Sequence, residues 1–345
     1  MSNSSEEFFK NAEKNRLSAE YKTAIELYKK ALRSFKQKGD VKGVLDCFLA
    51  IADTLRAKGD FIKAQTCYEK GLNLSEAIDD RDSEADALAG IGLCLRARGI
   101  WKEAFLQINR ALRIYRSRSD NYGEAFSLWA KAGTFRIKGD IKGAIRTFHL
   151  ARRKFKGIQD KAGFSYACCG LGGCSRIAGK FRVSGKYYRE ANKNFKELND
   201  LFGLAYSFCG IGNAKRMLRD YKEALLFFDK AATIYKKIGD EVSYAYTLWG
   251  IGTTYKMIGN LKRAGQKFRE SGAMFGKTRD PRGSIYSMLG IGELNYLAGD
   301  KEGAKRLFLR SAGLADSYKF KVEKGYAKEL LRAFKYGKGF PLNLP

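Results

Sequence analysis

The stretch YSFCGIGNAKRMLRDY, residues 206–221, contains the residue types of a phosphate-binding loop: a Gly-x-Gly followed by a Lys-Arg pair. A dinucleotide fingerprint needs a strand before its glycines, and a P-loop reads G-x-x-x-x-G-K-[ST], which this stretch does not contain. Gly210 and Gly212 recur at multiples of 40 residues, as Gly90/Gly92, Gly170/Gly172, Gly250/Gly252 and Gly290/Gly292. Because a chain does not carry five phosphate loops at a fixed period, we interpret these glycines as a repeated packing contact between helices.

The chain offers few residues that could act in catalysis or hold a metal ion. His149 is the single histidine, and it lies beside Phe148 at a packing position of a helix. The cysteine cluster of Cys168, Cys169 and Cys174 lacks the spacing of a zinc site and has no histidine near it. No combination of nucleophile, base and acid is visible. We therefore expect no enzymatic activity, no metal and no cofactor.

The charge and composition narrow the functional class. Lys and Arg total 65 against 37 Asp and Glu, a formal net charge of +28, which implies an anionic partner, strong solvation or both. Seven cysteines, an odd number, and the absence of an apolar run in the opening MSNSSEEFFK predict reduced thiols in a cytoplasmic protein. No stretch approaches the roughly 18 consecutive apolar residues of a membrane span, so we expect no membrane insertion.

The elements that position these residues follow the same period of 40. Apolar and small residues recur in columns separated by steps of 3, 4 and 3 residues, which is the apolar face of a helix. One repeat shows the columns at Tyr221, Ala224, Phe228 and Ala231. Small residues at fixed places let neighbouring helices approach closely, so the pattern predicts stacked helices.

A short turn precedes each such helix, as in AKGDF, RIKGDI and MIGNL. Its glycine suits the left-handed residue that ends a helix, and the Asp or Asn after it can cap the next helix. A second Asp recurs at 40, 80, 120, 160, 200, 240 and 280 and opens the following helix pair. The sequence therefore predicts eight helix pairs in one array over residues 1–320, for example 41–58 with 61–78. A capping helix at 321–336 and a tail at 337–345 follow.

This pattern resembles the tetratricopeptide repeat family over nearly the whole chain. The family's order of small residue, aromatic, alanine, aromatic and alanine is matched by Gly212, Tyr221, Ala224, Phe228 and Ala231. The ordinary repeat has 34 residues, whereas this one has 40 and lacks the closing proline, so it is more similar to the family's long-helix variety. The resemblance implies an all-α fold, a right-handed superhelical solenoid of antiparallel helix pairs whose first helices line a concave groove.

The first helix of each pair has a second face, which we expect to be free of packing. On the helix around 203–218, Tyr206, Cys209, Asn213 and Arg216 share this face at helical spacing. The predicted groove residues are a basic column, an aromatic column and selectivity positions: Arg56, Arg96, Arg136, Arg176, Arg216, Lys256, Tyr166, Tyr206, Tyr246, Trp129, Trp249 and Asn213.

Each column also has a structural interpretation. An arginine late in a helix favours the negative end of the helix dipole and can bridge to a neighbouring tyrosine or aspartate. The tyrosines can pack between adjacent first helices. Runs such as RALRIYRSR lie on second helices, where a charge run is usually a solvated face.

We expect a non-enzymatic scaffold whose basic and aromatic groove binds another protein through an acidic or extended segment, because guanidinium groups bind two carboxylate oxygens at once. Packed helices about 8–10 Å apart predict one arginine for every three to six residues of an extended segment. The alternatives are RNA or single-stranded nucleic acid, gripped by arginines and stacked on tyrosines, and docking of the basic convex face inside a larger assembly.

Overall fold

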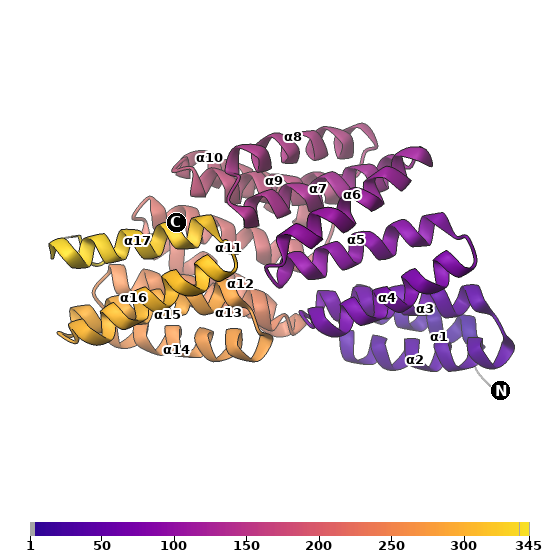
Figure 1. The fold of residues 1–345 in the computed structure, drawn as a ribbon, viewed down its shortest axis with the longest axis horizontal. Helices are drawn as coiled ribbons and strands as arrows, with labels where there is room; N and C mark the ends of the chain where they lie inside the picture. The colour runs from indigo at the N-terminus through magenta and orange to yellow at the C-terminus, as the bar shows by residue number, and fades with distance from the viewer. Residues whose placement is uncertain (1–3, 338, 345) are drawn as a thin grey trace. The chain divides into compact units, whose positions relative to one another are not determined.

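The computed structural model describes residues 4–337 and 339–344, and within them all regular structure is helical (Figure 1). The first helices of the pairs are α1 Ser5–Leu17, α3 Val41–Ala57, α5 Arg81–Ala97, α7 Asn121–Lys138, α9 Lys161–Ile177, α11 Leu201–Met217, α13 Glu241–Met257 and α15 Pro281–Leu297. The second helices are α2 Tyr21–Lys38, α4 Phe61–Ala77, α6 Trp101–Ser117, α8 Ile141–Gly157, α10 Phe181–Glu197, α12 Tyr221–Ile238, α14 Leu261–Thr278 and α16 Lys301–Ser317. The helix α17, Lys321–Tyr336, follows them unpaired. The predicted all-α repeat fold is confirmed.

The chain divides into two compact units. The N-terminal unit comprises the described residues up to Lys131 together with Ile238–Asp240, and the C-terminal unit comprises Ala132–Lys237 and the described residues from Glu241 onward. The division falls inside α7. That all eight pairs form one array stays a prediction.

The turns between helices have the predicted capping chemistry. The Asp40 carboxylate accepts a hydrogen bond from the backbone N–H of Gly43 at 2.8 Å and caps α3. Gly59, in the turn before α4, has φ +88°, a left-handed conformation that glycine adopts without steric cost. These two signals recur along the chain, although some turns place a residue other than glycine in the left-handed conformation, as Asp79 does with φ +54°.

The glycines of the opening stretch lie inside α11 and are packing points. A Cβ atom on Gly210 would lie 2.2 Å from the ring of Tyr188, and one on Gly212 would lie 2.9 Å from the ring of Phe228. Both distances are too short for a real contact. The glycines therefore let the rings of α10 and α12 approach the α11 backbone, and the predicted packing role is confirmed.

Two further sequence expectations concern the environment of the chain. Among the described residues, no helix is both long enough and apolar enough to cross a membrane. All seven cysteines are free, as the odd count suggested.

The packing role of Gly210 yields a first prediction. Gly210→Ala should lower the free energy of unfolding by about 1–3 kcal/mol, because the added methyl group overlaps the buried Tyr188 ring. Gly157→Ala is the matched control, since nothing lies within 4 Å of a Cβ atom there. Urea denaturation of both variants measures the difference. Equal stability of the two variants would contradict the packing role.

Candidate functional site

The predicted groove residues are divided between the two units. Arg56 of α3, Arg96 of α5 and Trp129 of α7 belong to the N-terminal unit. The other nine belong to the C-terminal unit: Arg136, Tyr166, Arg176, Tyr206, Asn213, Arg216, Tyr246, Trp249 and Lys256. We describe each set within its own unit.

Arg56 joins the two helices of its own pair. Its Nη2 donates to Asp53 at 2.9 Å and its Nε donates to the Tyr68 hydroxyl at 3.1 Å, while that hydroxyl donates to Asp53 at 2.5 Å. Burial alone would lower the pKa of Arg56, but Tyr68 and Asp53 raise it above its usual value. The same arrangement recurs in the first pair with Arg16, Glu13 and Tyr28. At these positions the arginine is a structural bridge between helices.

Arg96 occupies the same column in the third pair, where Leu93 stands in place of the acid. Its guanidinium lies 5.1 Å from the centroid of the Trp129 ring and donates to the Ala130 carbonyl at 3.4 Å. Arg96 therefore reaches the next first helix, in a cation–π contact with a second predicted groove residue.

The aromatic column also makes contacts within the fold. Tyr166 of α9 donates its hydroxyl to Asp200, the capping residue of α11, at 2.7 Å, and its ring lies 4.8 Å from that of Phe195. The ring of Tyr246 lies 4.7 Å from that of Phe275. The expectation that this face does no packing is therefore wrong, because these rings fill the space between successive first helices. A role for them in ligand binding stays a prediction.

The arginines of the C-terminal unit lack the acid that Arg56 has. Gly133, Gly173 and Asn213 occupy the positions equivalent to Asp53. The Nε atoms of all three column arginines are buried without a hydrogen-bond partner in the described structure: Arg136, Arg176 and Arg216. None of the three forms an ion pair with an acidic residue in the part of the chain that the structure describes.

The other cations nearby are already neutralised. Lys256 of α13 forms an ion pair with Glu293 of α15, and both side chains are only 2% exposed. Burial lowers the pKa of Lys256 and raises that of Glu293. Arg282 lies 2.7 Å from Glu323 of α17. We call the surface formed by Arg136, Arg176, Arg216 and Lys256 the inner face, and three of its four cations carry uncompensated charge.

The helix α17 borders the inner face. A Cβ atom on Gly139, in the turn between α7 and α8, would lie 2.7 Å from Cβ of Lys321 at the start of α17. The Tyr326 hydroxyl of α17 is buried without a hydrogen-bond partner in the described structure. Burial raises the pKa of Tyr326 to about 12, against the opposing charge of Arg176. Tyr326 therefore adds a further buried polar group without a hydrogen-bond partner to those of Arg136, Arg176 and Arg216.

Residues 339–344, which we call the tail segment, lie on this surface. Lys256 donates to the Leu342 carbonyl at 2.8 Å, and the Leu342 N–H donates to Glu293 at 2.7 Å. Arg216 donates to the Leu344 carbonyl at 3.0 Å and to the Asn343 side chain. The sequence analysis missed these contacts. The one signal it held was the apolar run FPLNL after two glycines, outside the repeat pattern.

These contacts bring two cations of successive repeats to one short segment. Leu342 and Leu344 are two residues apart, and they bind Lys256 and Arg216. One lysine and one arginine do not test the spacing of the arginine column, so one arginine for every three to six residues of a bound segment stays a prediction.

Arg216 is the most enclosed residue of the column. It is fully buried, and its guanidinium lies 5.6 Å from the centroid of the Trp249 ring and 3.3 Å from Asn213. Burial, together with the charge of Arg176, lowers the pKa of Arg216 to about 9. The group still carries its proton at neutral pH, so the folded protein holds a buried cation whose hydrogen-bond partners are neutral.

Other candidate sites in the chain give no catalytic arrangement. His149 lies edge-on to Tyr187 with ring centroids 6.4 Å apart, and burial lowers its pKa. No group of three His, Cys, Asp or Glu side chains in the described residues could hold a metal ion.

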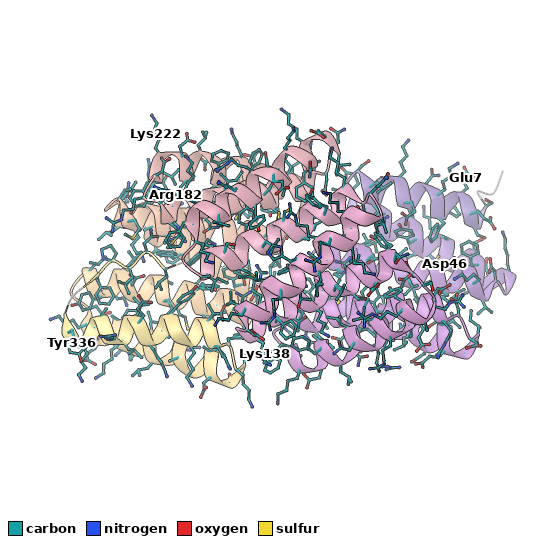
Figure 2. The ribbon with its side chains drawn as sticks, turned by 90° about the horizontal axis from the view of Figure 1, so that it is seen from above. Glu7, Asp46, Lys138, Arg182, Lys222 and Tyr336 are labelled. Carbon is teal, nitrogen blue, oxygen red and sulfur yellow. The ribbon has the colours of Figure 1, made fainter. Side chains whose placement is uncertain are left out.

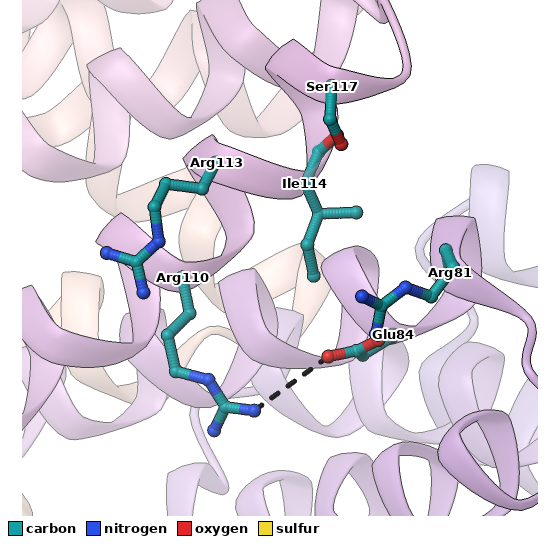
Figure 3. Close-up of a pocket in the computed structure, with 6 residues that line it drawn as sticks. All are labelled: Arg81, Glu84, Arg110, Arg113, Ile114 and Ser117. Carbon is teal, nitrogen blue, oxygen red and sulfur yellow. Dashed lines mark hydrogen bonds and ion pairs between the residues drawn. The ribbon is translucent and has the colours of Figure 1, made fainter.

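The outer helices carry solvated charge. The side chains of Arg182 and Lys222 are exposed on α10 and α12 (Figure 2). In the N-terminal unit, Arg110 of α6 faces Glu84 of α5 across a surface pocket, with 3.8 Å between Nη2 and the carboxylate (Figure 3). Arg113 points away from that carboxylate in the same view. Part of the outer charge is therefore already paired.

Residues 44–117 match the family model of the tetratricopeptide repeat. The helix pairs recur at the same 40-residue period before and beyond this segment. This segment is similar to the tetratricopeptide repeat, and the helix pairs on either side of it have the same architecture. No curated protein sequence matches it significantly.

The chain is also similar to solved structures of Rap proteins. The Rap conjugation gene regulator of the plasmid pLS20, in complex with the Phr* peptide, has a TM-score of 0.65 at 15% identity, covering 97% of this chain and 98% of that chain. A Rap protein complexed with competence and sporulation factor has a TM-score of 0.62 at 13% identity, covering 96% and 97%. The apo form of RapI has a TM-score of 0.57 at 13% identity, covering 84% and 98%. At these identities the likeness establishes the fold.

An arginine paired with an acid, such as Arg56, and one without an acidic partner, such as Arg136, should contribute differently to the stability of the fold. Arg56→Met should lower the free energy of unfolding by about 1–2 kcal/mol, because it removes two hydrogen bonds to Asp53 and Tyr68 that are partly exposed to solvent. Arg136→Met should leave the stability unchanged or raise it, because it removes a buried cation that has no acidic partner. Denaturant titrations of both variants measure this contrast. A loss for Arg136→Met as large as that for Arg56→Met would refute it.

Proposed function

We propose that this protein is a non-enzymatic interaction scaffold, and that the inner face of its C-terminal unit is a groove that binds an acidic, extended segment of another protein. One observation carries the proposal: Arg136, Arg176 and Arg216 are cations with buried Nε atoms and no acidic partner among the described residues. A buried charge is costly unless it is paired, and the same column is paired where the chain uses it structurally, at Arg56.

The chemistry of these groups favours carboxylates as the ligand. Guanidinium is a planar fork that binds two carboxylate oxygens, and such charge-assisted hydrogen bonds are about twice as strong as neutral ones. The two main-chain hydrogen bonds of Leu342 support a groove that binds a peptide backbone. A segment with acids at alternate residues would direct its carboxylates to one side, toward the cations.

The comparisons support a peptide or protein ligand at the level of the fold. Two of the similar structures, each spanning nearly the whole chain, are named as complexes with a peptide or with a factor that the Rap protein binds. Residues 44–117 match the tetratricopeptide repeat itself. We place the protein in the cytoplasm, because all seven cysteines are free.

Single-stranded nucleic acid is the second candidate. The cations of the inner face could bind the phosphates of a single strand as well as carboxylates. Against this candidate, Tyr166 and Tyr246 pack within the fold, which leaves fewer rings for base stacking. The binding experiment therefore includes RNA.

The experiment compares two double charge reversals in the same unit. Arg136→Glu with Arg176→Glu should weaken binding of a labelled Asp-Leu-Asp-Leu-Asp-Leu peptide at least tenfold, because the variant replaces both attractive cations by anions. Arg182→Glu with Lys222→Glu makes the same change of net charge on exposed outer positions and should leave the affinity within about twofold. Fluorescence anisotropy at two salt concentrations measures both.

Two outcomes would overturn the proposal. Loss of binding only in the outer variant would assign the function to the convex surface. Tight binding of a single-stranded RNA, abolished by the inner reversal and without binding of the peptide, would assign it to nucleic acid.

The control uses Arg182 and Lys222 in preference to the arginines of α6. Arg110 lies within 4 Å of the Glu84 carboxylate and Arg116 within 4 Å of the Glu124 carboxylate, so their reversal would also break ion pairs.

A further inference from the structure

We propose that the tail segment, residues 339–344, is an internal ligand of the inner face, which a partner segment must displace in order to bind. The inference rests on the proposed function, since it assumes that the inner face is the binding groove. The tail segment is not part of a repeat. It follows α17 after Gly337, whose φ of +62° ends the helix, and it contains Gly339 with φ +95°.

The tail segment is held through the main chain of Leu342. Both main-chain polar groups of Leu342 are bonded, the carbonyl by Lys256 and the N–H by Glu293. These contacts recognise a backbone and not a particular side chain, as in other modes of peptide recognition by main-chain hydrogen bonds. The same two side chains would therefore bind a partner segment in place of the tail.

The apolar residues of the tail segment fill the remaining space. Leu342 and Leu344 line one pocket together with Trp249, Thr253, Tyr286 and Leu289, and its volume of about 10 Å³ is too small for a further side chain. The ring of Phe340 stacks on that of Tyr296, with centroids 4.2 Å apart. Tyr296 occupies the position of the basic column in the eighth pair. The tail thus covers the column from Arg216 to its last member.

The contact with Arg216 shows why this ligand can be displaced. Asn343 forms two hydrogen bonds with Arg216, accepting one from the guanidinium and donating one to the main-chain carbonyl at 3.0 Å. The acceptors that the tail offers the guanidinium are neutral: the Asn343 amide oxygen and the Leu344 carbonyl. A carboxylate at the position of Asn343 would lose the bond donated to the Arg216 carbonyl but would supply the missing charge, and a charge-assisted hydrogen bond is about twice as strong as a neutral one. The tail is therefore a weaker ligand than an acidic segment of the same shape.

The test uses the full chain in an opened form, Leu342→Ser with Leu344→Ser, which removes the two apolar contacts that hold the tail. The probes are two labelled pentapeptides with blocked ends, FPLNL, the sequence of residues 340–344, and FPLDL. The opened variant should bind FPLDL at least tenfold more tightly than the wild type does. It should also prefer FPLDL to FPLNL by about tenfold, and Arg216→Gln in the opened variant should abolish this preference.

A second measurement follows the tail itself. The Leu342 amide donates a hydrogen bond to Glu293, so its hydrogen exchange should be slow in the wild type and fast in the opened variant. Adding FPLDL to the wild type should accelerate its exchange. Rapid exchange in the unliganded wild type would show that the tail does not occupy the inner face and would overturn the inference.

The outcomes separate this inference from the proposed function. Equal binding of FPLDL by the wild type and the opened variant would overturn the internal ligand and leave the groove in place. No binding of FPLDL or of the acidic hexapeptide by either protein would overturn both. A wild-type dimer that the opened variant does not form would assign the tail to the inner face of a second copy and would overturn the contact within one chain.

Discussion

The structure depends on one repeated contact, in which an aromatic ring of a second helix is held between glycines of two first helices. The ring of Tyr188 on α10 faces Gly172 of its own pair and Gly210 of the next, and a Cβ atom on either glycine would lie within 2.7 Å of it. Phe228 has the same relation to Gly212 and Gly250. Because the ring spaces the backbones on both sides, it also sets the distance between the side chains that the first helices present on their other face.

On that other face, a single neighbouring residue decides what a repeated arginine does. Where Asp53 stands three residues before Arg56, the arginine, the acid and Tyr68 satisfy one another, and the two helices of the pair are joined. Where glycine or asparagine stands at that position, the guanidinium extends toward the next repeat: a Cβ atom on Gly173 would lie 2.8 Å from Nη1 of Arg136. The same residue type at the same position is therefore paired with an acid in one unit and has no acidic hydrogen-bond partner among the described residues of the other.

Much of the fold could be predicted from the sequence because it is periodic. The 40-residue columns located the helices, and the Asp and Gly of each turn located their ends, within about a residue for α3 and α4. The hydrogen bond from Tyr166 to the capping residue Asp200 could also be predicted, because the tyrosine and aspartate columns are separated by 34 residues in the sequence. The tail segment could not be found this way. It has no counterpart in the repeats, and Asn343 bonds to a residue 127 positions earlier in the chain. The burial of Arg216 depends on that contact, so it was missed as well.

The short connection between α17 and the tail segment has a consequence for how the protein selects its partners. A ligand tethered by a short flexible linker experiences an effective concentration in the millimolar range, and a free peptide with the same contacts would have to reach that concentration to replace it. With the tail segment as the internal ligand that we propose, the inner face would reject weak acidic segments. It would respond to segments that bind much more tightly than the tail, or to segments that a second contact already holds nearby. Because effective concentration falls with linker length, the distance from Tyr336 to Phe340 sets this threshold independently of the residues that make the contacts.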